Sequence, residues 1–203
     1  MHLYTAGTPN GRKVSIALAE LGLDYEMTWV HLDREEQKTP EFLAMNPNHK
    51  IPVLEDDGHV IWESGAILLH LGERHDSEGI ILPKDSKTRM DAIQYAFFQA
   101  GGVGPNLGRL GAAVRKEGEK NIEMIQIFSG EIKRLMGVID RILGDGREYL
   151  AGPYSIGDIM HYPWLKVLKD LGAREILDFE RVSDWLSRIE ARPAVAKGMA
   201  VPE

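Results

Sequence analysis

The sequence predicts an α/β domain followed by an all-helical domain, and three observations support this prediction. Short apolar runs alternate with helical patterns over residues 1–76, and turn-forming residues separate them. Over residues 87–203, apolar residues recur almost throughout at the helical period of about 3.6. Residues 77–86 carry Gly79, Pro83 and several charges, so we expect them to link the two domains.

The beginning of the chain predicts a βαβ unit. His2–Thr5 is a short candidate strand, and the Pro and Gly of Thr8–Gly11 indicate a loop. Val14–Leu21 has apolar residues at helical spacing, and Gly22 stands where the C-cap of that helix is expected. Tyr25–Leu32 then predicts a second strand, which completes the unit.

The following segment predicts a helix, a hairpin and another helix. Thr39-Pro40 is a helix start, with Thr at the N-cap and Pro at the first helical position. Ile51–Glu55 and His59–Trp62 are candidate strands joined by Asp57-Gly58, a two-residue hairpin signal. We expect Ser64 to cap the helix that follows. The order βαβ, α, ββα is that of the thioredoxin fold.

The second half of the chain predicts helices only. Ala92–Gln99 fits one helix, and Ile122–Leu143 fits a long one with an apolar stripe. Ser155–Asp158 is a capping box, to which we assign a structural role in opening a further helix. Trp185–Ile189 marks the last clear helix, which Arg192-Pro193 ends.

Composition excludes several classes of protein and site. A formal net charge of −7 without any Lys/Arg run argues against a nucleic-acid partner. No segment reaches the ~18 apolar residues of a membrane span, and Met1–Tyr4 does not begin a signal peptide, so we expect a cytoplasmic protein without a membrane partner. The chain has no cysteine, so any thiol must come with a ligand. The seven histidines show no ligand spacing, and we expect no metal.

Thr8–Gly11 is the first candidate ligand-binding segment. It joins the first strand to the first helix, where ligands of open α/β sheets bind. Free N–H groups and the positive helix end favour an anion such as a thiolate, to which the Thr8 hydroxyl could donate a hydrogen bond. A plain loop with a helix cap explains the same residues, so this segment alone does not decide between the two interpretations.

Ile51-Pro52 and Glu63-Ser64 are two further candidates. The Ile51–Pro52 bond could be cis, as about 5% of X–Pro bonds are. Alternatively, Pro52 could occupy the first position of an edge strand. Ser64 is explained as an N-cap, but Glu63 and Ser64 could also hold the ammonium and the carboxylate of an amino acid.

Taken together, these segments resemble the soluble glutathione S-transferase superfamily, from Leu3-Tyr4 to Arg192-Pro193. Within it, the chain is most similar to the nu class, the bacterial disulfide-bond oxidoreductase-like glutathione transferases. The supporting segments are Thr8–Gly11, Asn48–Pro52, Glu63–Leu68, Gly101–Pro105 and the capping box of Ser155–Asp158. The resemblance implies a thioredoxin-like, glutathione-binding domain, an all-α C-terminal bundle and a homodimer.

The resemblance also implies which residues activate the glutathione thiol. Thr8 and Asn10 would lie near the sulfur, as the catalytic residues. The backbone of Ile51, before a cis Pro52, would pair with the cysteinyl part of glutathione as an added strand does.

The two ends of glutathione would meet a further set of residues by the same resemblance. Glu63 and Ser64 would hold the γ-glutamyl end. Lys50, together with Asn48 and Gln37, would meet the glycyl carboxylate.

The resemblance implies an enzyme that uses bound glutathione, as a co-substrate, to reduce a small disulfide. A close alternative is conjugation of glutathione to an electrophile, in a pocket between the domains lined by residues such as Tyr95, Phe98, Met160 and Trp164. An alternative of another class is a non-catalytic glutathione-binding or regulatory protein, because fold does not fix function.

Overall fold

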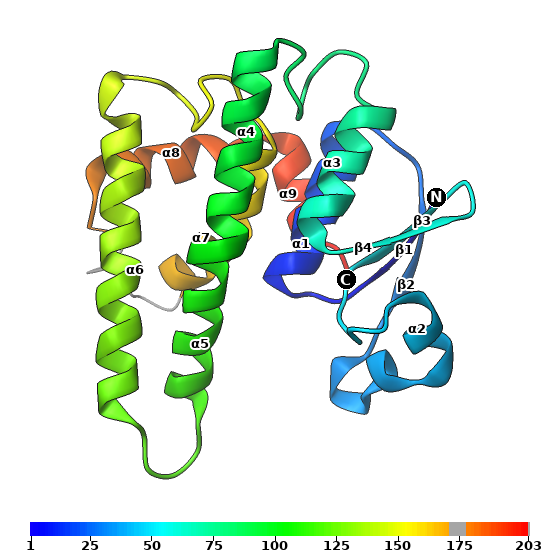
Figure 1. The fold of residues 1–203 in the computed structure, drawn as a ribbon, viewed down its shortest axis with the longest axis horizontal. Helices are drawn as coiled ribbons and strands as arrows, with labels where there is room; N and C mark the ends of the chain where they lie inside the picture. The colour runs from blue at the N-terminus through cyan, green and yellow to red at the C-terminus, as the bar shows by residue number, and fades with distance from the viewer. Residues whose placement is uncertain (171–177, 203) are drawn as a thin grey trace. The chain divides into compact units, whose positions relative to one another are not determined.

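The structure is a computed structural model in which residues 1–170 and 178–202 are described. The chain divides into two compact units, drawn as ribbons in Figure 1. Met1–Leu82 and Ala191–Glu203 form the first unit, and Pro83–Glu190 form the second. No helix in the described ranges is long and apolar enough to cross a membrane.

The first unit contains a four-stranded sheet with the order β2-β1-β3-β4. The strands are β1 (His2–Thr5), β2 (Glu26–Trp29), β3 (Val53–Asp56) and β4 (His59–Trp62). β1 runs parallel to β2 and antiparallel to β3, and β3 and β4 form an antiparallel hairpin. Leu3 of β1 pairs with both neighbours and is fully buried. All four predicted strands are confirmed, although β2 and β3 are shorter than expected.

Helices cover both faces of this sheet. α1 (Pro9–Glu20) and α3 (Ser64–Arg74) pack against each other. α2 (Pro40–Met45) begins at the predicted Thr39 cap, whose hydroxyl oxygen accepts the N–H of Phe42 at 3.3 Å. Since Phe42 packs against Val53 while the neighbouring Leu54 points to the opposite face, α2 lies on the face away from Leu54.

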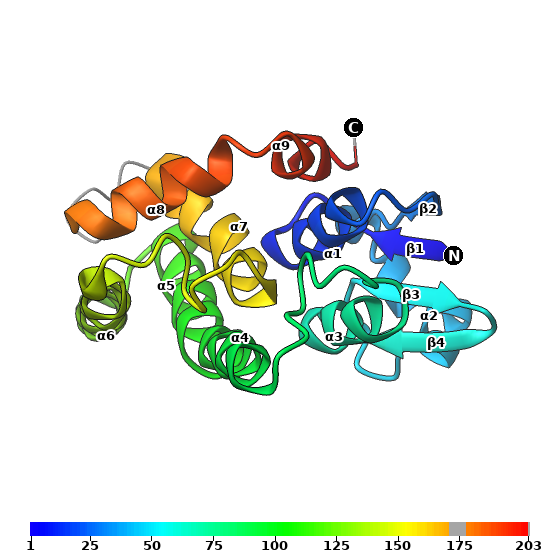
Figure 2. The same cartoon turned by 90° about the horizontal axis from the view of Figure 1, so that it is seen from above.

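The C-terminal helix α9 (Pro193–Met199) belongs to the first unit, whereas the sequence prediction placed residues 87–203 together in the helical domain. α9 packs along α1, as Figure 2 shows. The Ser15 hydroxyl donates to the carbonyl of Gly198 at 2.6 Å, and Arg192 pairs with Glu20 at 2.7 Å. A helical period shows that a helix buries one side, but it does not show against which partner.

The predicted linker also differs from the structure in part of its length. The buried Asp76 carboxylate accepts hydrogen bonds from the backbone N–H groups of Ile80, Ile81 and Leu82. Leu82 packs against Gly72 of α3, where an added Cβ would lie 2.6 Å from the leucine. These contacts hold the segment up to Leu82 in the first unit, beyond the predicted boundary at residue 76.

Among the described residues of the second unit, the regular elements are helices, as predicted. These are α4 (Ser86–Phe98), the π-helical turn η3 (Gln99–Val103), α5 (Gly104–Arg115), α6 (Ile122–Ile142), the 3-10 turn η4 (Leu143–Asp145), α7 (Ile156–Asp170) and α8 (Glu180–Glu190). The predicted capping box opens α7: the Asp158 carboxylate accepts the backbone N–H of Ser155 at 2.9 Å. The same carboxylate accepts the indole N–H of Trp185 at 2.8 Å, which joins α7 to α8.

Candidate functional site

Thr8 is the N-cap residue of α1, and Asn10 follows it in the first turn. The hydroxyl oxygen of Thr8 accepts the N–H of Gly11 at 3.3 Å. Because the oxygen acts as an acceptor in this bond, the hydroxyl keeps its own proton for donation to another group. Both Thr8 and Asn10 are partly exposed, so a ligand can reach them.

The tight packing of Gly11 holds the loop in front of α1. A Cβ at Gly11 would lie 2.3 Å from the carbonyl oxygen of Ala6 and 2.4 Å from the Thr5 hydroxyl. No side chain fits at this distance from backbone, so the position requires glycine. The close approach of the helix to the end of β1 sets the place of the Thr8 side chain.

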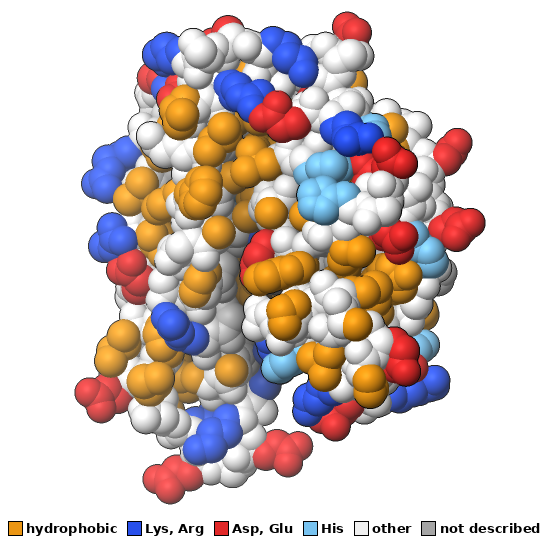
Figure 3. All heavy atoms as spheres, turned by 45° about the vertical axis from the view of Figure 1, so that its right-hand side comes forward, with side chains coloured by type: hydrophobic (Ala, Val, Ile, Leu, Met, Phe, Trp, Pro, Cys, Tyr) orange, Lys and Arg blue, Asp and Glu red, His pale blue; other side chains and the backbone are white. Residues whose placement is uncertain are grey.

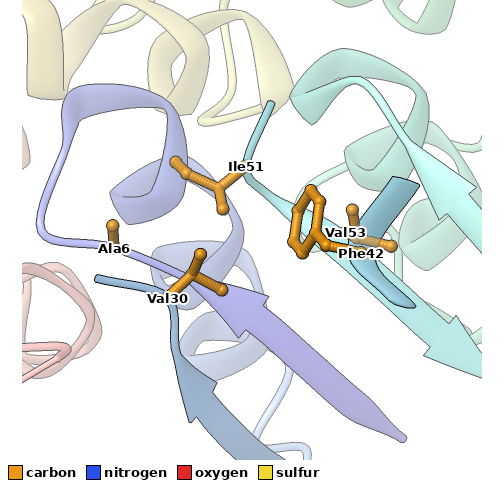
Figure 4. Close-up of a cluster of buried hydrophobic side chains, with 5 residues drawn as sticks. All are labelled: Ala6, Val30, Phe42, Ile51 and Val53. Atoms are coloured by element: carbon orange, nitrogen blue, oxygen red, sulfur yellow. The ribbon is translucent and has the colours of Figure 1, made fainter. Parts of the chain in front are cut away.

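Ile51 and Pro52 are joined by a cis peptide bond, as the family resemblance implied. Figure 4 shows the Ile51 side chain among Ala6, Val30, Phe42 and Val53, a cluster of buried apolar side chains. The paired register of β3 begins only at Val53. The backbone of Ile51 therefore precedes the sheet pairing, where an extended ligand can add as a further strand.

Asn46 organises the loop before Ile51, a role that the sequence analysis missed. It is buried, its amide nitrogen donates to the carbonyl of Lys50 at 2.7 Å, and its amide oxygen accepts the N–H of Asn48 at 2.9 Å. The side chains of Asn48 and Lys50 are exposed. An Asn just after a short helix and before a Pro is typical of such side-chain-to-backbone turns, and this was the available sequence signal.

The prediction that Ser64 is the N-cap of α3 is wrong. α3 begins at Ser64, and Glu63 is the N-cap residue, with φ 72° and ψ 115°. A Ser at a helix start fits either position, and residue types alone do not reveal the backbone of Glu63. Such a backbone costs about 1–3 kcal/mol in a non-glycine residue and is typical of functional sites.

Lys13 is a further residue of this region that the sequence analysis missed. It is buried on α1, and its ammonium nitrogen lies 3.5 Å from the hydroxyl of Ser64. Burial lowers the pKa of Lys13 to about 7, while the Glu63 carboxylate acts in the opposite direction. A Lys within the apolar run of α1 was the available sequence signal. Its position links the start of α3 to α1.

Gln37 lies on the short 3-10 helix η2 (Glu36–Lys38). Its side-chain oxygen is buried and has no hydrogen-bond partner among the residues that the structure describes. A buried polar atom in this state is costly unless a ligand or water satisfies it. This observation is compatible with the predicted contact to a ligand, but no hydrogen bond within the described ranges joins Gln37 to Lys50.

All predicted site residues lie in the first unit. The shared apolar cluster brings Ile51 to Ala6, just before Thr8, and Lys13 brings Ser64 to α1. A separate hollow of about 600 Å³ lies at the other end of β1, lined by residues that include His2 and Glu55. It contains none of the predicted site residues, so we do not assign the site there.

Comparison with known proteins identifies the family. The model of the glutathione S-transferase N-terminal domain matches residues 1–73, and the model of the C-terminal domain matches residues 88–193. The chain belongs to the glutathione S-transferase family.

Individual relatives agree with this assignment. Glutathione S-transferase 1 of Schizosaccharomyces pombe is 41% identical over 92% of this chain and 89% of its own length. The disulfide-bond oxidoreductase YfcG of Escherichia coli is 35% identical over 97% of this chain and 93% of its own. A glutathione transferase of Burkholderia graminis, solved with two glutathione molecules per subunit, is 41% identical with a TM-score of 0.91, covering 100% of this chain and 88% of its own.

Proposed function

We propose that this protein binds glutathione in the first unit, stabilises its thiolate with Thr8 and Asn10, and uses it to reduce disulfides of small molecules. The observation that carries this proposal is the Thr8 hydroxyl, which accepts from Gly11 and so keeps its proton for the sulfur. The chain has no cysteine, so the reacting sulfur is that of glutathione. The similarity to YfcG, named a disulfide-bond oxidoreductase, supports this reaction over others.

The reaction balances with two molecules of glutathione. The first thiolate attacks one sulfur of the disulfide, so a mixed disulfide forms and one thiol leaves. A second glutathione thiolate attacks the glutathione sulfur of the mixed disulfide, releasing the second thiol and leaving oxidised glutathione. Lowering the pKa of a thiol by one to two units requires about 1.4–2.7 kcal/mol, which a hydroxyl hydrogen bond and a helix N-terminus together supply.

The remaining predicted residues have proposed roles in binding. Glu63 and Ser64 hold the γ-glutamyl end. Glu63 stands at the N-cap position without a side-chain capping hydrogen bond, and its strained backbone supports a functional role for the side chain. Ile51 pairs with the cysteinyl part through its backbone. Lys50, together with Asn48 and Gln37, meets the glycyl carboxylate, and all of these residues lie in the first unit. We also propose a homodimer, and the cytoplasmic location stays a prediction.

Conjugation of glutathione to an electrophile is the second candidate, because it needs the same thiolate. Of the side chains expected to line its pocket, Tyr95 and Met160 are buried, and Phe98 and Trp164 are partly exposed. We favour disulfide reduction because of the similarity to YfcG, named a disulfide-bond oxidoreductase.

The test is turnover of a small dialkyl disulfide with glutathione, with oxidised glutathione measured through a coupled reductase. We expect Thr8→Ala to lower turnover about 10- to 100-fold, the equivalent of one charge-assisted hydrogen bond, while glutathione affinity changes much less. Thr39→Ala is the matched control, because Thr39 caps α2 with the same 3.3 Å bond and precedes a Pro in the same way.

Two outcomes would contradict the proposal. Turnover by Thr8→Ala within about two-fold of the parent would exclude Thr8 as the activating group. Glutathione binding without any disulfide turnover by the parent would favour conjugation or a non-catalytic role instead.

A further inference from the structure

Three side chains that can bind a metal meet beside the β3–β4 hairpin. Asp56 ends β3, His70 lies in the last turns of α3, and His75 directly follows that helix. One carboxylate oxygen of Asp56 lies 2.8 Å from Nε2 of His70 and 2.6 Å from Nε2 of His75. A ligand atom from each residue lies within 4.8 Å of the other two.

We propose that Asp56, His70 and His75 bind one divalent transition-metal ion of the zinc type. Two imidazoles and a carboxylate are ligands that Zn²⁺ accepts, with water completing four-fold coordination. A neutral imidazole that binds through Nε2 carries its single proton on Nδ1, so the proton of each ring that donates from Nε2 to Asp56 moves to Nδ1 and the contact is replaced by a metal bond. This site shares no residue with the proposed glutathione site.

The geometry needs only a small adjustment. Tetrahedral coordination with bonds of about 2.1 Å separates neighbouring ligand atoms by about 3.4 Å. The Asp56 oxygen lies 2.8 and 2.6 Å from the two imidazole nitrogens, so these separations must widen by about 0.6–0.8 Å. His59 on β4 is a further nearby donor, with its ring centroid 5.8 Å from that of His70.

The cluster is only partly buried, so an ion can reach it from solvent. The Asp56 side chain is nearly buried, while His70 and His75 are partly exposed, at 17% and 22%. Histidine side chains reach the surface among charged groups in Figure 3. An anionic ligand held below two imidazoles open to solvent is the arrangement that a metal ion can reach from outside.

Arg74 places a positive charge beside this cluster. Its Nε lies 4.0 Å from the Asp56 carboxylate, and its terminal nitrogen pairs with Asp57 at 2.9 Å. The Arg74 side chain is more than half exposed, so it can keep its ion pair with Asp57 while it moves away from an incoming ion. Its charge opposes a cation nevertheless, so we expect Arg74→Gln to tighten metal binding.

The sequence expectation of no metal site depended on spacing along the chain. His70 and His75 are five positions apart, which is not a spacing that places two ligands on one helix face. They converge because α3 ends at Arg74, and the backbone of His75 leaves the helix. Asp56 comes from a strand, and the sequence did not predict that this strand lies beside the end of α3.

The experiment is titration of the untagged, EDTA-treated chain with Co²⁺ and then Zn²⁺, without glutathione because its thiol binds both ions. We expect one ion per chain, a visible Co²⁺ absorption band, and its loss when Zn²⁺ displaces Co²⁺. The His70→Gln/His75→Gln double variant should bind at least about ten-fold more weakly. His2→Gln is the control, since His2 also pairs with a carboxylate, that of Glu26 at 3.5 Å.

A measurement on the parent protein covers the case in which the double variant does not fold. X-ray absorption of the Zn²⁺-loaded parent should show two imidazoles with oxygen ligands completing the shell. Binding by the double variant equal to that of the parent would overturn the proposal. So would fewer than two imidazoles in the absorption spectrum, or no bound ion at about 100 μM Zn²⁺, far above the range of specific zinc sites.

Discussion

Burial acts in opposite directions on the pKa values of Lys13 and Asp158. Burial lowers the pKa of Lys13 to about 7, and it raises that of Asp158 to about 6. Asp158 accepts the N–H groups of Leu150 and Ser155 and the indole N–H of Trp185, all of which favour the carboxylate. At neutral pH Asp158 is therefore mostly ionised, while Lys13 is divided between its two forms.

The Lys13 pKa makes stability depend on pH in a defined window. Between about pH 7 and 10.5 the unfolded chain keeps the Lys13 proton and the folded chain has released it, so the free energy of unfolding rises with pH. The contribution is at most about 1.4 kcal/mol per pH unit. We expect Lys13→Met to remove this slope, measured as urea midpoints at pH 7, 8 and 9.

The control for this prediction is Lys133→Met, at an exposed position of α6. It should leave the slope of the parent unchanged. If Lys13→Met and the parent gained stability equally between pH 7 and 9, the Lys13 amine would hold its proton throughout and the assigned pKa would be wrong.

At the scale of elements, α9 packs so closely on α1 that no side chain fits at Gly198. A Cβ at Gly198 would lie 2.4 Å from Cα and 2.5 Å from the backbone nitrogen of Ile16. Backbone atoms cannot move aside as a flexible side chain can, so α9 must shift as a whole. We expect Gly198→Ala to lower the free energy of unfolding by about 1–3 kcal/mol and to expose the segment around α9 to proteases.

Gly130→Ala is the matched control for this substitution. Gly130 lies within α6, and a Cβ there meets no atom within 4 Å. The alanine should therefore stabilise the protein by up to about 1 kcal/mol through helix propensity. Unfolding of Gly198→Ala at the same denaturant concentration as the parent would show that α9 packs less closely than the structure indicates.

Local signals predicted the elements well, but not which element each would contact. The Thr39 cap, the Asp57-Gly58 hairpin and the capping box at Ser155 are set by neighbouring residues, and the structure has all three. The place of α9 depends on contacts between Gly198 and Ile16, far apart in sequence. Residue types could not reveal such contacts.

The same distinction applies to the candidate site. Resemblance to a family supplied the proposed residues from Thr8 to Ser64, and the cis bond before Pro52 is confirmed. It did not supply Lys13, whose relation to Ser64 arises from the packing of α1 on α3. The unusual backbone of Glu63 was likewise outside what capping preferences predict.

At the scale of the whole molecule, the second unit exposes large apolar side chains that its own core does not use. On α4, Met90 and Phe97 are 61% and 67% exposed, and their spacing of seven positions places them on one helix face. On the first half of α6, Ile122, Met124 and Ile127 are exposed as well. Exposed apolar groups of this size are typical of a protein interface, which supports the proposed homodimer.

The dimer makes a prediction for Phe97. The parent should have about twice the chain mass of 22.7 kDa in light scattering after gel filtration. Phe97→Glu would bury a charge without a partner in the interface, so we expect the mass of one chain at the same concentration. Phe97→Leu keeps an apolar side chain and should remain a dimer. A parent that has the mass of one chain, or a Phe97→Glu variant that stays dimeric, would show that this face of α4 is not the interface, and the exposed phenylalanine would then need a different partner.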